Sequence, residues 1–315
     1  HAYKMILSTL DKSRKGGAYE QIPSLVLGQR WTPQLNSRNM MKVVLCVWIE
    51  PYIENDLSFC VWPVHTPTTS KEVLTLSAST SPLPYTGNKS CIVNTILSVM
   101  PKHTVYIDPC MGSAKVFFRK PRAEKEILND YNGDLVNLFR VIQNNEKLAY
   151  LLGRLYLSIN GELAFKQNKD RLKGVPNILD DVIETSQIFY DASWEDIQNA
   201  AAFLENQVYS FSSTGQTFGI ARRDMSQRLP RLMSAYNRIR DAIILHRDYK
   251  DVITYAACPG SFILLDPPYK GTEDMYSKAN FDIEQHDILF SFMSEVNQQH
   301  HGEVKFLITY NNDPY

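Results

Sequence analysis

The stretch that decides the fold of this chain is Phe262-Ile263-Leu264-Leu265-Asp266-Pro267-Pro268-Tyr269. Its apolar first half predicts a short buried strand, and the two prolines end that strand, because proline has no N–H to donate and its ring fixes φ. In an open α/β sheet, ligands bind at the carboxyl ends of the strands. We therefore expect a ligand site directly after residue 265.

The residues at this strand end also suggest a chemistry. Asp266 offers two acceptor oxygens, Pro267 a rigidly held carbonyl, and Tyr269 a flat π-face. Together they suit an aromatic ring with an exocyclic amino group, such as adenine. Two acceptors holding the amino hydrogens would free the nitrogen lone pair to attack an electrophilic methyl group. The alternative is a plain turn, with Asp266 as a cap and Gly271 closing it.

Three further blocks precede this one along the chain. Residues 85–90 (Tyr-Thr-Gly-Asn-Lys-Ser) open a helical pattern, residues 104–114 read as a strand breaking into a turn of small residues, and residues 126–132 read as a strand ending in an acid. In this order the four blocks resemble the D12 class, or Dam type, of S-adenosylmethionine-dependent DNA adenine-N6 methyltransferases. The resemblance covers roughly residues 83–315.

The resemblance implies S-adenosylmethionine as cofactor. Asp108 would lie near the cofactor's ammonium, Lys89 near its carboxylate, Asp130 on its ribose hydroxyls and Asp248 on the amino group of its adenine. The cofactor-binding residues expected on this basis are Tyr85, Gly87, Lys89, Asp108, Pro109, Cys110, Gly112, Asp130, Asp248, Tyr249 and Asp266.

Each cofactor assignment has a structural alternative. Residues 108–114 could be an ordinary strand-to-helix connection, Lys89 could be a solvated side chain, and Asp130 and Asp248 could be helix N-caps. The chain also departs from the resembled family at Cys110, where an aromatic residue is usual, and at Ala114, where a second glycine is usual.

The order of elements predicts an α/β fold. Strands are expected at 104–108, 125–129, 242–247, 261–265 and 304–310, with helical patterns near 89–100, 133–152 and 282–299. This alternation favours a doubly wound parallel sheet, Rossmann-like in the resembled family. We expect residues 81–150 and 239–315 to form the catalytic domain. Residues 151–238 would form an inserted helical target-recognition domain, with helix-like segments at 180–189, 194–206 and 226–244.

The two ends of the chain do not join this pattern. Residues 1–80 are an extension of unknown role, and residues 61–84 have the composition of a linker. The resembled fold continues with a hairpin after the strand at 304–310, whereas this chain ends at residue 315. We therefore expect a truncated carboxyl end and an exposed sheet edge.

Residues 222–240 predict a surface for DNA. They contain six arginines against a single acid, Asp224, and interleaved apolar residues (Leu229, Leu232, Met233, Tyr236 and Ile239) that predict a helix with one core face and one cationic face. The alternative is a solvated basic face. A second basic cluster, which could follow the backbone phosphates of DNA, comprises Lys166, Lys169, Arg171 and Lys173. The six arginines are Arg222, Arg223, Arg228, Arg231, Arg238 and Arg240, and the expected DNA contacts are Ser212, Thr214, Arg222, Arg223, Arg228 and Arg231.

Composition sets further bounds. With 315 residues, 44% of them hydrophobic, the chain can bury a large core. The net charge of −1 means that DNA binding requires a local patch. The five cysteines include no C-x-x-C pair, which argues against zinc and disulfides, so we expect no metal and a cytoplasmic location. The apolar stretch at 43–49 is too short to span a membrane.

The hypothesis from sequence is a site-specific DNA adenine-N6 methyltransferase, a monomer, that flips its target base out of the duplex to stack on Tyr269. Three rivals are a cytosine-N4 methyltransferase, where serine is typical at the position of Asp266, a protein-glutamine methyltransferase, where asparagine is typical, and a catalytically silent DNA-binding relic. The recognition sequence and a cognate restriction endonuclease are left open. An Asp266 side chain buried in a salt bridge, or far from any cleft shared with Asp130, would count against an enzyme.

Overall fold

The computed structural model describes residues 42–45, 81–85, 89, 92–180, 192–221, 223–268 and 283–311. Four residues named above, Gly87, Arg222, Tyr269 and Gly271, lie outside this part of the chain, as do the expected linker up to residue 80 and most of the helix-like segment at 180–189. No helix in the described part is long and apolar enough to cross a membrane.

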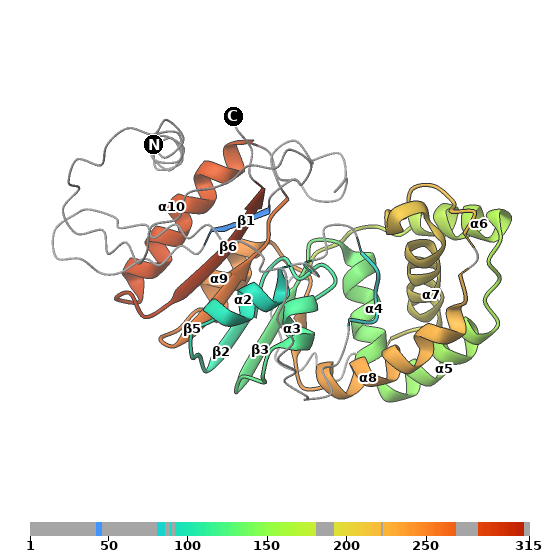
Figure 1. Cartoon of the computed structure of the whole chain (residues 1–315), viewed down its shortest axis with the longest axis horizontal. Helices are drawn as coiled ribbons and strands as arrows, with labels where there is room; N and C mark the ends of the chain where they lie inside the picture. Colours follow the sequence, from blue (N-terminus) through green and yellow to red (C-terminus); the bar gives the residue numbers. More distant parts are fainter. Residues whose placement is uncertain are drawn as a thin grey trace, which may run out of the picture.

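Six strands of the described residues form one sheet in the order β1-β6-β5-β2-β3-β4 (Figure 1). Strands β2 to β6 are mutually parallel, and all five were predicted from the sequence. The α/β class and the central parallel sheet are therefore confirmed. The strands are β1 (Lys42–Leu45), β2 (Val105–Asp108), β3 (Lys125–Asn129), β4 (Ile243–Leu245), β5 (Ser261–Leu265) and β6 (Lys305–Asn311).

Helices cover both faces of the sheet because successive strand residues point to opposite sides. Tyr106 and Phe262 pack into one apolar cluster with α2 (Val93–Val99), α3 (Lys115–Arg119) and α4 (Gly133–Gln143). Their neighbours Ile107 and Ile263 pack into a second cluster with α9 (Tyr249–Ala256) and α10 (Ile283–Gln299). Burial on both faces explains why these strands read as continuous apolar runs rather than alternating ones.

The expectation of an exposed sheet edge at the last strand was wrong. Strand β1, from the amino-terminal extension, pairs antiparallel with β6 along its length, from Lys42 opposite Asn311 to Leu45 opposite Ile308. The last four residues of β6, from Ile308 to Asn311, are therefore paired with β1 on the side that faces away from β5. Part of the extension thus belongs to the sheet.

The single helix expected over 133–152 is two helices, α4 and α5 (Asn145–Tyr156). Asn144 between them adopts an extended conformation (φ −93°, ψ 119°), and its side-chain oxygen accepts hydrogen bonds from the backbone N–H groups of Glu146 and Lys147. Asparagine is a favoured N-cap residue, so it ends one helix and begins the next.

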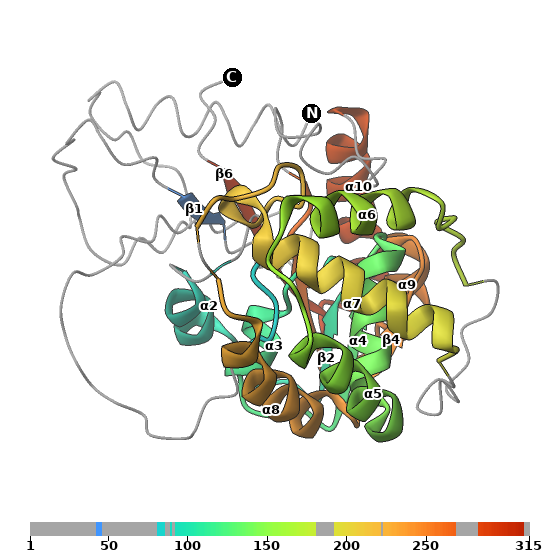
Figure 2. The same ribbon diagram turned by 90° about the vertical axis from the view of Figure 1, so that its right-hand side faces the viewer.

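The described residues between 145 and 239 (145–180, 192–221 and 223–239) form a mostly helical region beside the sheet (Figures 1 and 2). Helix α7 begins with a capping box between Ser193 and Asp196, and it packs against α4, α5 and α6. The elements that follow α5 are α6 (Glu162–Lys173), α7 (Trp194–Tyr209), the 3-10 helices η2 (Phe211–Ser213) and η3 (Met225–Arg228), and α8 (Leu229–Ile239).

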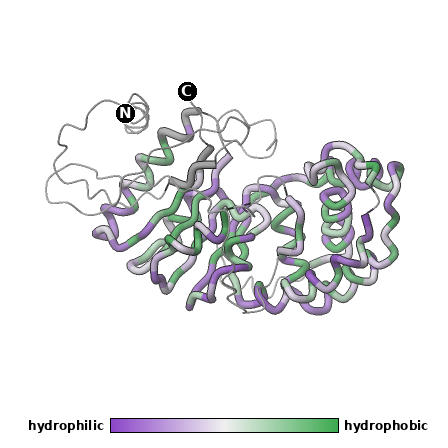
Figure 3. Tube along the Cα trace, in the orientation of Figure 1, coloured by the Kyte–Doolittle hydropathy of each residue, from purple (hydrophilic) through white to green (hydrophobic). Residues whose placement is uncertain are grey.

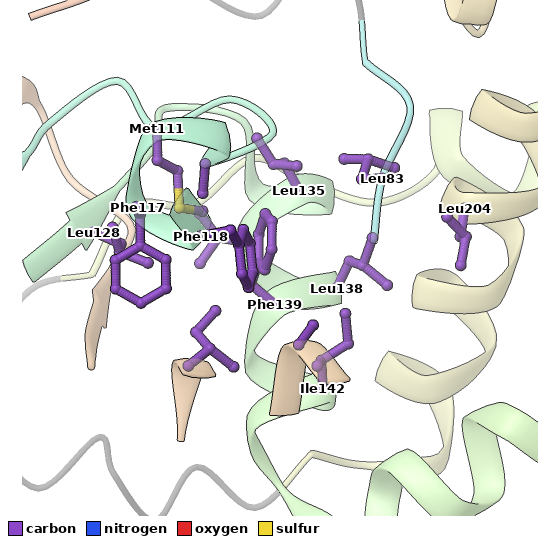
Figure 4. Packing of buried hydrophobic residues seen from close by; sticks show 14 of the residues in the cluster. Leu83, Met111, Phe117, Phe118, Leu128, Leu135, Leu138, Phe139, Ile142 and Leu204 are labelled. Atoms are coloured by element: carbon purple, nitrogen blue, oxygen red, sulfur yellow. The ribbon is translucent and has the colours of Figure 1, made fainter. Parts of the chain in front are cut away.

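This helical region shares its core with one face of the sheet. Figure 3 shows apolar residues concentrated on the strands and along the inner sides of the helices. Helix α4 lies in the middle of the core, with Phe139 stacked near Phe118 at 6.2 Å between ring centroids and Leu138 toward Leu204 of α7 (Figure 4). We therefore expect the two regions to unfold cooperatively.

Two side chains of the arginine-rich segment lie on the opposite face from that predicted. Met233, assigned to the core face, is 58% exposed, whereas Arg238 is buried beneath the helix. Arg238 forms an ion pair with Glu126 of β3 and stacks on the Phe117 ring at 3.7 Å. Glu126 also accepts a hydrogen bond from Lys120 at 2.6 Å. Burial acts to raise the pKa of Glu126, but the hydrogen bonds from Arg238 and Lys120 outweigh burial and lower this pKa below its usual value.

We expect Arg238→Met to lower the free energy of unfolding by about 3 kcal/mol, because removing one member of a buried charged group leaves its partner undercompensated. The matched control is Arg240→Met on the exposed side, where the ion pair with Asp241 spans 3.6 Å and the change should cost below about 1 kcal/mol. Urea unfolding of both variants measures the difference. Equal small losses would show that the buried pair contributes little.

Candidate active site

The carboxyl ends of β2, β3, β4 and β5 border one cavity of about 300 Å³. This size falls at the lower end of the range for small-molecule sites. Pro267 is buried and is not among the residues that line the cavity. Of the expected catalytic and cofactor residues, those that line the cavity are Tyr85, Lys89, Asp108, Pro109, Cys110, Gly112, Asp130, Asp248, Tyr249, Asp266 and Pro268.

Asp108, the last residue of β2, is a buried acid with an unsatisfied oxygen. Its Oδ2 accepts a hydrogen bond from the Tyr106 hydroxyl at 3.0 Å, while no group among the described residues donates to its buried Oδ1. Burial raises the pKa of Asp108 to about 8, against the hydrogen bond from Tyr106, which lowers it; the nearby acids Asp266 and Asp130 raise it further. A buried acceptor without a donor at a cavity wall suits a cationic ligand group.

Asp130 directly follows β3, and its side chain accepts a hydrogen bond from the backbone of the turn after β2. Its Oδ2 accepts from the Gly112 N–H and its Oδ1 from the Asn132 N–H, both at 2.9 Å. Burial raises the pKa of Asp130 to about 6, opposed by these backbone bonds, so the carboxylate is mainly ionised at neutral pH. The N-cap alternative for Asp130 was wrong, because Asn132 caps α4 by accepting from the N–H of Asp134.

The turn after β2 contains two residues in the left-handed region, Gly112 and Ala114. Gly112 has φ +48°, and an added Cβ would lie 3.7 Å from the Tyr85 ring. Ala114 also adopts the left-handed region, with φ 51°, where a residue with a Cβ is strained by about 1 kcal/mol. A glycine would remove that strain. At Cys110, burial and the neighbouring acids Asp130 and Asp108 raise the pKa of the thiol, so it remains neutral.

Asn129 connects two walls of the cavity and was not singled out in the sequence. Its buried side-chain amide donates to the carbonyls of Pro109 and Arg247 and accepts from the Arg247 N–H, each at 2.9 Å. These bonds hold the loop after β2 to the loop after β4. A polar residue inside the apolar strand pattern at 127–129 was the available signal.

Asp248 acts as the N-cap of α9, as the structural alternative proposed. Its Oδ1 accepts from the Lys250 N–H at 2.9 Å. The side chain nevertheless lines the cavity together with Tyr249, so capping places a carboxylate there. Burial, followed by the charge of Asp248, raises the pKa of the Tyr249 hydroxyl.

Asp266 forms an ion pair without being buried. Its Oδ2 lies 2.5 Å from the Nζ of Lys89, and its Oδ1 accepts a hydrogen bond from the Thr309 hydroxyl at 2.5 Å. The Asp266 side chain is 24% exposed and lines the same cavity as Asp130. Because the carboxylate remains open to that shared cavity, this ion pair does not count against an enzyme in the way that burial would. Lys89 is buried and paired, so the solvated-lysine alternative was wrong.

The expected DNA contacts lie in the helical region. Arg223, Arg228 and Arg231 form no ion pair with any described acid, and burial, then Arg231 and Arg223, lower the pKa of Arg228. Three guanidinium groups therefore lie close together with no described carboxylate against them, and that of Arg223 donates to the Val208 carbonyl at 2.6 Å. Ser212 is exposed in a left-handed conformation, and the Thr214 hydroxyl donates to the Phe211 carbonyl.

The second basic cluster, on α6, is largely engaged within the protein. Arg171 pairs with Glu195 at 2.8 Å, Lys173 lies 3.3 Å from Asp170, and Lys169 donates to the carbonyl of Gln216 at 2.7 Å. These contacts favour a solvated structural face over a surface that follows phosphates.

Five parallel strands with acids at or after several of their carboxyl ends surround one cavity at that edge, which is where open α/β sheets generally bind ligands. The family model of the D12 class N6 adenine-specific DNA methyltransferases matches residues 85–315, and the chain belongs to this family.

Three curated relatives are similar at low identity. A DNA N-6-adenine-methyltransferase of Escherichia phage P1 is 24% identical over 73% of this chain and 29% of its own length. Modification methylase StsI of Streptococcus sanguinis is 25% identical over 73% of this chain and 35% of its own length. Type II methyltransferase M1.LlaDCHI of Lactococcus lactis subsp. cremoris is 23% identical over 59% of this chain and 64% of its own length. The chain therefore spans about a third of the first two relatives.

Proposed function

We propose that this protein transfers a methyl group from S-adenosylmethionine to N6 of adenine in double-stranded DNA, with the target base flipped out of the duplex. The observation that carries the proposal is the single cavity shared by Asp266, Asp108 and Asp130. A carboxylate suited to an amino group and two acids suited to a cofactor thus face the same space.

The residues present fit S-adenosylmethionine. The unsatisfied Oδ1 of Asp108 would accept from the cofactor's ammonium, and the ionised Asp130 from its ribose hydroxyls. Asp248 and Tyr249 would border its adenine. Lys89, which pairs with Asp266, is also placed to meet the cofactor's carboxylate. When bound, S-adenosylmethionine supplies an electrophilic methyl group on a sulfonium.

The chain's own contribution would be positioning and electrostatics. Asp266 and the carbonyl of Pro267 would accept the two hydrogens of the target amino group and direct the nitrogen lone pair toward the cofactor side of the cavity. Tyr269 would stack on the extruded base. After transfer the nitrogen is positively charged and strongly acidic, so its proton can pass to solvent without a strong base.

Residues 151–238 would act as the target-recognition region, and residues 81–150 and 239–315 as the catalytic region. The cluster of Arg223, Arg228 and Arg231, which forms no ion pair with an acid in the described part of the chain, supports this, because guanidinium groups bind phosphates and the edge of guanine in bidentate fashion. Arg222, Ser212 and Thr214 would contribute to the same surface. A monomer suffices for this arrangement.

Two measurements test the proposed function. Calorimetry should show binding of S-adenosylmethionine, and DNA from cells expressing the protein should carry N6-methyladenine at a defined sequence. Modification of cytosine in place of adenine would favour the cytosine-N4 rival. Absence of both cofactor heat and DNA modification would favour the silent relic.

We expect Arg228→Gln combined with Arg231→Gln to weaken binding to a duplex oligonucleotide. If each arginine contacts one phosphate, the slope of log K against log salt should fall by about 2, because each lost phosphate contact removes roughly 0.9. The matched control is Arg171→Gln, since that guanidinium is paired with Glu195. An unchanged salt slope in the double variant would remove this cluster from the DNA surface.

A further inference from the structure

Thr309, a residue outside every sequence motif discussed above, bonds directly to the proposed catalytic carboxylate. Strands β5 and β6 are parallel, with Leu265 opposite Ile308, so the next residues, Asp266 and Thr309, lie side by side. The Thr309 hydroxyl donates to Asp266 Oδ1 at 2.5 Å, and both residues line the cavity.

The Thr309 hydroxyl completes a two-sided clamp on Asp266. Lys89 holds Oδ2 at 2.5 Å while Thr309 holds Oδ1, so donors on both oxygens fix the plane of the carboxylate. Without such donors the terminal torsion of an aspartate is broad and roughly two-fold. Each carboxylate oxygen can accept more than one hydrogen bond, so the clamp leaves acceptor capacity for a ligand.

The burial of Thr309 indicates that its hydroxyl has a specific role. Thr309 is 1% exposed, and valine would have nearly the same shape at this position. A buried hydroxyl is favourable only with a hydrogen-bond partner, and the Thr309 hydroxyl has Asp266 as its partner. Because threonine is branched at Cβ, its χ1 is stiff, so the strand backbone fixes the direction of the donated hydrogen.

We propose that Thr309 is a positioning residue for methyl transfer, orienting Asp266 so that its carboxylate accepts the amino hydrogen of the target adenine. This inference rests on the proposed function. Small misplacements of a reacting group can cost about 100-fold in rate. The contacts proposed above for the cofactor, on Asp108, Asp130, Lys89, Asp248 and Tyr249, do not include Thr309. Loss of the hydroxyl should therefore lower kcat and leave cofactor affinity unchanged.

The test compares Thr309→Val, which keeps the shape and removes the donor, with Thr309→Ser, which keeps the donor and removes a methyl group. We expect kcat for adenine methylation to fall about 50-fold in the valine variant and to stay within about 3-fold in the serine variant. The dissociation constant of S-adenosylmethionine should change less than about 3-fold in both. Thr95→Val, at a buried threonine of α2, is the control with unchanged kcat.

Three results would overturn the inference: a valine variant with normal kcat, a serine variant as impaired as the valine variant, or loss of cofactor affinity equal to the loss of kcat. If the Thr309→Val variant does not fold, kcat is compared between Thr309→Ala, which lacks the hydroxyl, and Thr309→Ser, which keeps it. A wild-type protein that neither binds the cofactor nor methylates adenine would instead contradict the proposed function.

Discussion

Replacement of Asp266 by alanine should reduce kcat for adenine methylation by about 1,000-fold or more. The change removes both carboxylate oxygens from the cavity, and loss of one preorganised polar group at a reacting centre already costs about 100- to 1,000-fold. Asp266→Asn keeps one acceptor oxygen but presents an N–H₂ group, so an intermediate loss is expected. Single-turnover methylation of duplex DNA measures both rates.

Cofactor affinity separates a catalytic role of Asp266 from a structural one. Alanine leaves the buried ammonium of Lys89 without its carboxylate, so some loss of stability is expected in that variant. The asparagine variant should fold normally and bind S-adenosylmethionine within a few-fold of the wild type. Asp241→Ala, at an exposed acid, serves as the control. Full activity in Asp266→Asn would remove Asp266 from the chemistry.

Replacement of Asp108 by asparagine should weaken binding of S-adenosylmethionine about 100-fold or more near pH 8. The side chain would lose the charge that the cofactor's ammonium is expected to meet, in a buried place where charge pairing is strong. In the wild type, affinity should be greatest near pH 8. Below that pH the carboxyl group of Asp108, with a pKa of about 8, must first lose a proton before it can pair with the cofactor's ammonium. Above it the free amino group of the cofactor must gain one, since α-amino groups titrate at about 7.7 to 8.0.

The same substitution should make the folded protein more stable at high pH. The pKa of Asp108 rises from 3.8 to about 8 on folding, so the folded state holds this proton more tightly than the unfolded state. Stability is therefore lost as pH rises from about 4 to 8, and each unit of difference is worth about 1.4 kcal/mol. The Asp108→Asn variant does not lose stability in this way. The difference in free energy of unfolding between the variant and the wild type should therefore be greatest above pH 8 and vanish near pH 4.

Urea unfolding of the wild type and Asp108→Asn at pH 5, 7 and 9 measures this dependence. The expected result is a gap between the two proteins that widens with pH while cofactor binding is lost. A gap independent of pH would show that Asp108 is ionised in both states, and a variant that binds the cofactor normally would separate Asp108 from the ammonium.

Much of the site could be predicted because its signals are local. Asp108 ends an apolar strand, Asp130 and Asp266 each come directly after one, and parallel strands bring their carboxyl ends to the same edge. Asp248 follows the short strand β4 at the same edge. Strand ends, prolines and small residues are properties of a few neighbouring residues, so the sequence alone shows them.

The errors arose where contacts join segments far apart in the chain. Arg238 resembled its exposed neighbours until Glu126, 112 positions earlier, was found beneath it. Met233 and the pairing of β1 with β6 likewise depend on which surface the fold covers. Periodicity shows that a helix has two faces, but only packing shows where the boundary between them falls.

The sequence by itself determined the α/β class, the five parallel strands and the acids at their ends, because each depends on local propensity and on where apolar runs stop. Only the tertiary structure decided that β1 completes the sheet, that Arg238 is internal, and that Thr309 and Lys89 hold the two oxygens of Asp266. Those features depend on register and burial, which are set when distant strands and helices pack together.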